Sequence, residues 1–104
     1  MISSTSMNKL KFLPSAERDL ENLKNDRSKI RMLKDVVKTL NLMEVNLRHP
    51  SLNTHEYQFF SGPNGEKVFG AYAQQNTPRA YRILWFYGPR RNTISILAII
   101  PHID

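Results

Sequence analysis

The last quarter of the chain, residues 81–104, constrains the fold more than any other segment. It reads YRILWFYGPRRNTISILAIIPHID, two apolar runs separated by a short polar stretch with glycine and proline. Runs of β-branched and aromatic residues on either side of such a turn predict a β-hairpin, here with strands over 81–87 and 93–100. A two-stranded hairpin is only marginally stable alone, so further strands or helices must pack on it.

Arg82 lies inside the first of these apolar runs. Burying an unpaired charge costs on the order of several kcal/mol, so an arginine in a strand needs solvent, a carboxylate or a ligand. The sequence has no aspartate or glutamate between Glu66 and Asp104, whereas four arginines fall in that interval. We therefore expect Arg82 either to lie on an open, solvated face of the sheet or to contact an anion such as phosphate.

Two helices are predicted in the first half of the chain. Ser15 is a suitable N-cap for a helix over 15–24. Apolar residues at three- and four-residue spacing predict a second helix over 26–44. The residues that we expect the two helices to bury are Leu20, Leu23, Leu33, Val37 and Leu40.

Most strands are expected after the helices. Alternation predicts a strand over 67–73, and shorter segments predict strands over 9–13 and 56–60. Early helices followed by late strands predict an α+β fold, with two N-terminal helices packed on one face of a mostly antiparallel sheet of four or five strands. We expect a single domain over 1–104, in which the small and polar residues 1–7 are disordered.

Composition narrows the classes of partner and site. The formal net charge of +6 favours acidic or polyanionic partners. The chain has no cysteine, which excludes disulfides and thiolate metal sites and fits the cytoplasm. The histidines have no carboxylates at ligand spacing, so we expect neither a metal nor a cofactor. No apolar run is long enough to span a bilayer and no signal peptide is evident, so a cytoplasmic protein is predicted.

Four segments, taken in order, resemble the RelE/ParE superfamily of bacterial toxin–antitoxin modules. They are KFLPSAERDLENL, NLRHPSLNTHEYQ, YRILWFY and ILAIIPH, and they lie between residues 11 and 102. The resemblance implies the same helix pair on an antiparallel sheet. It also implies one of two activities: metal-independent cleavage of mRNA on the ribosome, as by RelE-type toxins, or binding of DNA gyrase, as by ParE-type toxins. In either case an acidic antitoxin protein would bind and silence the chain.

The resemblance also implies site residues. Arg82 would hold the scissile phosphate, and His102 would act as an acid or base at the end of the last strand. The alternative for His102 is a solvated strand end without a catalytic role. RelE-type relatives often carry lysines on the strand before YRILWFY, where this chain has FGAYA, so Tyr72 is the third catalytic candidate. The candidates for binding substrate are Arg48, His49, His55 and Arg79. His49 has a structural alternative, in which it bonds to the backbone of its own turn. If the chain has no catalytic site, it would be a protein-binding or a non-toxic relative of these toxins.

Overall fold

The computed structural model describes residues 7–75 and 79–101. The elements are β1 (Lys9–Phe12), α1 (Pro14–Lys24), η1 (Arg27–Lys29), α2 (Ile30–Val45), η2 (Pro50–Leu52), β2 (His55–Ser61), β3 (Lys67–Tyr72), β4 (Tyr81–Tyr87) and β5 (Thr93–Pro101), where η marks a 3₁₀ turn. This order confirms the predicted α+β fold. The disorder expected for residues 1–7 concerns a stretch outside the described residues, apart from Met7.

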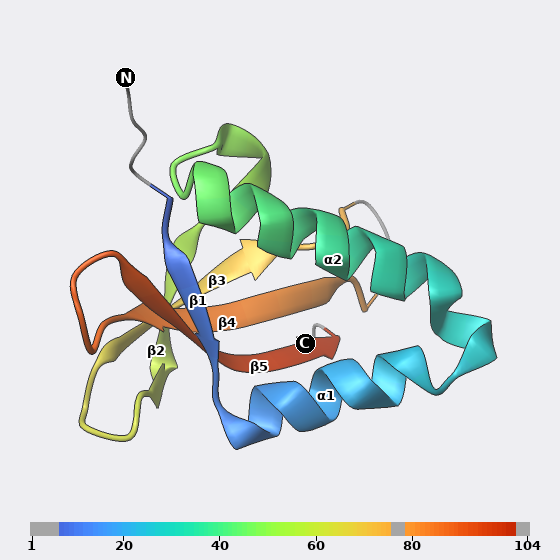
Figure 1. The fold of residues 1–104 in the computed structure, drawn as a ribbon, viewed down its shortest axis with the longest axis horizontal. Coiled ribbons are helices and arrows are strands. Elements are labelled where there is room, and N and C mark those ends of the chain that lie inside the picture. The colour runs from blue at the N-terminus through green and yellow to red at the C-terminus, as the bar shows by residue number, and fades with distance from the viewer. Residues whose placement is uncertain (1–6, 76–78, 102–104) are drawn as a thin grey trace.

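The five strands form one sheet in the order β1-β5-β4-β3-β2. All neighbouring strands are antiparallel except β1 and β5, whose parallel register pairs Lys9 with Thr93. Helices α1 and α2 run antiparallel to each other and are joined through η1 (Figure 1). β2 forms one edge of the sheet and pairs with β3.

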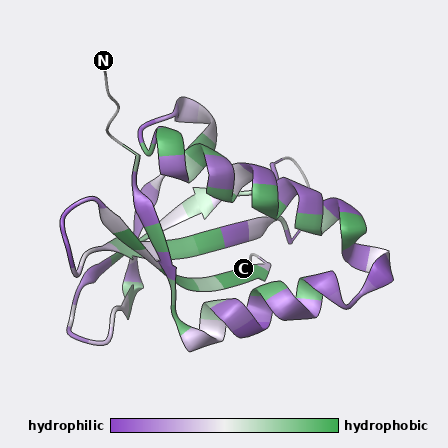
Figure 2. Ribbon diagram, in the orientation of Figure 1, coloured by the Kyte–Doolittle hydropathy of each residue, from purple (hydrophilic) through white to green (hydrophobic). Residues whose placement is uncertain are grey.

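The core lies between the helices and the central strands β4 and β5. Helix residues such as Leu23, Leu40 and Met43 pack there with Ile83 and other residues of the two strands. Figure 2 shows that β4 and β5 carry mainly apolar residues along the stretch that faces the helices. Every residue of β4 from Tyr81 to Phe86 is buried, so this strand is covered on both faces.

The start of α1 differs from the prediction. Ser15 does not cap the helix, because α1 begins at Pro14 and its N-cap residue, Leu13, makes no side-chain cap. The fixed φ of proline suits the first helical turn, which allows the helix to begin one residue earlier. The Ser15 hydroxyl instead donates to the Leu97 carbonyl oxygen at 2.6 Å and fastens α1 to β5.

The second helix begins at Ile30, four residues later than predicted. Asp26 accepts a hydrogen bond from the Ser28 amide at 3.0 Å, which favours the tighter 3₁₀ turn η1 before the helix. The first and last residues of every predicted strand lie within one residue of the observed bounds.

The predicted buried stripe of α2 is partly wrong. Leu23 of α1 and Leu40 of α2 are buried as expected, and Leu20 and Leu33 are half-buried against the core. Val37 is 40% exposed. The buried residues of α2 are Val36, Thr39, Leu40 and Met43, so the buried face of the helix is centred nearer to Val36 than to Val37. None of the described helices is long and apolar enough to cross a membrane.

Candidate functional site

Arg82 is buried in the middle of the sheet, on the face opposite the helices. Only 7% of the residue is exposed, so it is not a solvated surface arginine. Its Nε and Nη1 atoms have no hydrogen-bond partner among the described residues. A buried cation of this kind is costly unless another group compensates it. Arg82 is therefore the strongest candidate for binding an anion.

Tyr72 lies next to Arg82 and His55 lies next to Tyr72, so the fold links three of the predicted site residues through the Tyr72 ring. The register pairs Tyr72 of β3 with Arg82 of β4, and the Arg82 Cζ atom lies 3.9 Å from the centre of the Tyr72 ring. This cation–π contact holds the guanidinium plane without neutralising its charge. The His55 ring lies 5.6 Å from the Tyr72 ring and stacks on the Tyr57 ring at 4.9 Å.

A pocket of about 260 Å³ opens beside Arg82. It is lined by Tyr57, Phe59, Phe60, Arg82, Leu84, Ile100 and Pro101. Among the described residues of this lining, Arg82 is the only charged one, and the others are apolar or aromatic. Apolar walls exclude water, which strengthens the attraction between the guanidinium and an anion that enters.

β2 supplies three aromatic residues of this pocket that the sequence analysis missed: Tyr57, Phe59 and Phe60. A Cβ atom on Gly70 would lie 2.5 Å from the Tyr57 ring, so the ring can lie against β3 only because residue 70 has no side chain. The pairing of β2 with β3 is irregular between Glu56 and Ser61, which frees this stretch from the regular ladder. In the sequence, Gly70 inside an alternating strand was the signal that another group, here the Tyr57 ring, approaches the strand closely.

His55 is held in one orientation by the backbone. Its Nδ1 atom lies 3.1 Å from the Asn53 carbonyl oxygen. A carbonyl oxygen only accepts hydrogen bonds, so this contact assigns the proton to Nδ1 and leaves Nε2 of the neutral ring free to accept a proton. His55 thus has the tautomer that a general base needs.

Burial raises the pKa of the Tyr57 hydroxyl above its ordinary value of 10.0, although the nearby charge of Arg82 partly opposes this effect. The folded protein therefore holds the phenol proton more tightly than the unfolded chain does. We expect Tyr57 to stabilise the fold fully below pH ~10 and to lose that contribution as pH rises through the raised pKa. The difference in unfolding free energy between the wild type and Tyr57→Phe should be constant from pH 7 to 9 and should shrink above pH ~10. A difference that grows with alkaline pH would contradict the raised pKa.

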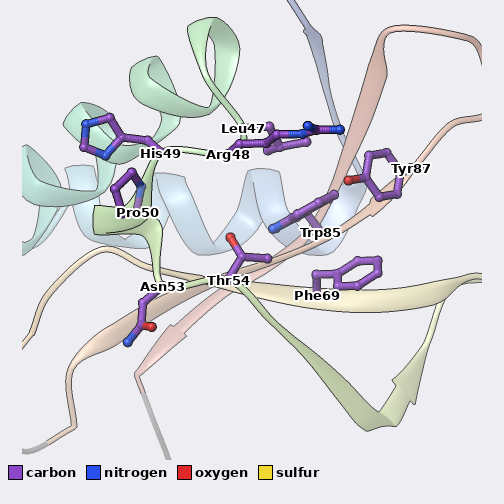
Figure 3. Close-up of a pocket in the computed structure, with 9 residues that line it drawn as sticks. All are labelled: Leu47, Arg48, His49, Pro50, Asn53, Thr54, Phe69, Trp85 and Tyr87. Carbon is purple, nitrogen blue, oxygen red and sulfur yellow. The ribbon is translucent and has the colours of Figure 1, made fainter.

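The other predicted site residues lie elsewhere. Arg48 and His49 line a separate pocket of about 360 Å³ with Trp85 and Tyr87 (Figure 3). The His49 Nδ1 atom accepts a hydrogen bond from the Ser51 amide at 3.1 Å, which is the structural alternative considered for it.

Arg79 lines a third pocket, of about 470 Å³, together with Lys29 and Arg31. His102 lies outside the described residues. Within residues 7–75 and 79–101, no group of three or more histidine, aspartate or glutamate side chains is placed to hold a metal ion.

Comparison with known proteins gives the fold but no close relative. No protein-family model matches the sequence, and no curated protein matches it significantly. Among solved structures, the YoeB/ParE toxin from Agrobacterium tumefaciens has a TM-score of 0.65 and 10% identity, covering 91% of this chain and 99% of that one. The DinJ–YafQ toxin–antitoxin complex from E. coli has a TM-score of 0.63 and 10% identity, covering 92% of this chain and 93% of that one.

The YoeB–YefM complex from Staphylococcus aureus gives a TM-score of 0.62 at 13% identity, covering 92% of this chain and 98% of that one. At these identities the similarity concerns the backbone and does not transfer an activity. The chain therefore has the fold of the RelE/ParE toxin superfamily, as its sequence predicted.

Proposed function

We propose that the chain is a RelE-like toxin of a toxin–antitoxin module that cleaves mRNA on the ribosome without a metal ion. The observation that carries this proposal is Arg82, a buried guanidinium with two nitrogen atoms that lack partners in the described structure. A phosphodiester supplies the charge and the acceptor oxygens that this group lacks.

The proposed reaction is attack of a ribose 2′-hydroxyl on the adjacent phosphorus. The 2′-oxygen forms a bond to phosphorus, the bond to the 5′-oxygen breaks, and a 2′,3′-cyclic phosphate and a 5′-hydroxyl result. Arg82 stabilises the negative charge that grows on the phosphate oxygens. The Nε2 atom of His55 is available to take the 2′-hydroxyl proton, since Nδ1 is bound to the Asn53 carbonyl oxygen.

The leaving 5′-oxygen needs a proton donor. Tyr57 is a candidate for this role because it lines the pocket beside Arg82 and its phenol carries a proton at neutral pH. His102 is a second candidate, by resemblance to the closing strand of RelE-type toxins. Tyr72 acts as a positioning residue, because its ring lies under the Arg82 guanidinium.

A neighbouring basic pocket supports an RNA ligand. Lys29, Arg31 and Arg79 line it, and it shares Pro101 with the Arg82 pocket. An RNA strand with one phosphate on Arg82 can place further phosphates on these three cations, which contribute affinity without reading sequence. The +6 net charge likewise fits a cytoplasmic protein that meets ribosomal RNA and is held by an acidic antitoxin.

One observation favours a second function, binding of a protein target without catalysis. Phe59 is fully exposed, and Phe60 is 45% exposed at the rim of the Arg82 pocket. Exposed aromatic side chains of this kind are common at the centre of protein interfaces. In this reading the aromatic residues of β2 dock on a protein such as gyrase, and Arg82 pairs with a carboxylate of that protein.

Induced expression in a bacterial host separates the two functions. We expect wild-type chain to arrest growth and shorten translated mRNAs, and Arg82→Gln to do neither at the same protein level. Phe59→Ser should weaken arrest only slightly if RNA is the target, since Phe59 is a rim residue. Growth arrest with intact mRNA that Phe59→Ser abolishes would establish the protein-binding alternative.

A further inference from the structure

The pocket of Figure 3 lies on the helix side of the sheet, away from Arg82. It is formed where the chain leaves α2 and passes through η2 toward β2, against the aromatic side chains of β3 and β4. Its floor consists of Phe69, Trp85 and Tyr87, whose ring centres lie 4.9 to 5.7 Å apart. The proposed cleavage reaction uses none of these residues.

Trp85 carries a polar group that the fold leaves unsatisfied. The residue is 1% exposed, and its Nε1 atom has no hydrogen-bond partner among the described residues. Figure 3 shows the nitrogen-bearing edge of the indole directed toward the space beside the Thr54 hydroxyl. A buried N–H without an acceptor costs about 1–3 kcal/mol, which a ligand with an acceptor oxygen removes.

The rest of the lining defines the ligand. None of the described residues that line the pocket carries a carboxylate, and Leu47 and Arg48, in the turn after α2, cover it. The ligand that suits this lining therefore has an acceptor oxygen for the Trp85 N–H, a negative charge for Arg48, and apolar neighbours for Phe69 and Leu47. The pocket volume of about 360 Å³ accommodates one or two side chains.

We propose that this pocket anchors a carboxylate side chain, flanked by apolar residues, from an acidic protein partner. The partner's identity as an antitoxin rests on the proposed function, whereas the chemistry of the pocket does not. RNA fits less well for two reasons. Trp85 and Tyr87 pack edge to face at 82°, so they present no parallel platform for a base, and the sheet separates the pocket from Arg82.

The chain offers a direct reporter, because Trp85 is its only tryptophan. The probe is the capped peptide acetyl-Leu-Glu-Leu-amide, titrated into 15N-labelled full chain while the single indole N–H signal is followed by NMR. We expect a saturable shift of that signal. The matched peptide with glutamine in place of glutamate should bind roughly tenfold more weakly, because it lacks the charge that Arg48 recognises.

Two variants keep the reporter and test the pocket. Arg48→Gln should weaken binding of the glutamate peptide roughly tenfold, and Arg18→Gln, on the exposed surface of α1, should leave it unchanged. No shift up to ~10 mM peptide, or equal shifts with both peptides, would overturn the proposal. A shift with hexauridylate in place of the peptide would assign the pocket to RNA and overturn it as well. Loss of growth arrest leaves these results unaffected, so the two proposals fail separately.

Discussion

Replacing Arg82 with glutamine is expected to reduce the rate of mRNA cleavage on purified ribosomes by about 10²–10³-fold. The reason is the loss of a charge that stabilises the transition state, which is typically worth about 3–4 kcal/mol inside a water-excluding site. Glutamine keeps a polar side chain of moderate length at a buried position. Alanine would be less informative, because Arg82 is buried and its truncation would leave a cavity beside Tyr72.

Two further variants give this prediction its controls. Arg82→Lys retains the charge but loses the planar fork, so it should recover only part of the rate. Arg91→Gln removes an exposed arginine at the turn between β4 and β5 and should cleave at nearly the wild-type rate. Unfolding curves must show that each variant is folded at the assay temperature. Equal rates for the folded Arg82→Gln and Arg91→Gln proteins would remove Arg82 from the catalytic site.

Leu40→Ala is expected to lower the free energy of unfolding by about 2–5 kcal/mol, a large part of the stability of a domain of this size. Leu40 is 6% exposed and packs in the core between α2 and the sheet. Val37→Ala is the matched control on the same helix. Since Val37 is 40% exposed and alanine favours helices, its change should stay within about 0.5 kcal/mol.

Urea unfolding followed by the fluorescence of Trp85 measures both variants. The midpoint should fall for Leu40→Ala with an unchanged slope, because the surface exposed on unfolding stays nearly the same. Similar losses for the two variants would mean that α2 is rotated differently from the structure described above. The same curves supply the folding control for every variant of the site.

The sequence predicted the fold well because the hairpin and the order of elements leave few alternatives. Two apolar runs around a glycine-proline turn determine β4 and β5, and each keeps its bounds within one residue. The orientation of α2 was harder to predict from the sequence. Adjacent positions Val36 and Val37 carry the same side chain, and only packing against the sheet decides which of them is buried.

The site was predictable only in part, for reasons of geometry. The lack of nearby acids singled out Arg82. The register of β3 with β4 pairs Tyr72 with it, and the register of β2 with β3 places His55 opposite Gly70, two residues from Tyr72. Tyr57, Phe59 and Phe60 were missed because the irregular pairing of β2 with β3 has no simple signature in a single sequence. Arg48 and Arg79 were named as candidates for binding substrate, and the fold places them in other pockets.

The chemistry of the RNA ends made during induced expression tests the central claim most directly. If the Arg82 pocket directs attack by the 2′-hydroxyl, transcripts from cells that express the wild-type chain should carry new 3′ ends with a 2′,3′-cyclic phosphate and new 5′-hydroxyl ends. These ends should be absent from cells that express Arg82→Gln at the same level and present with Arg91→Gln. Growth arrest without new RNA ends, or new ends that persist with Arg82→Gln, would contradict the account.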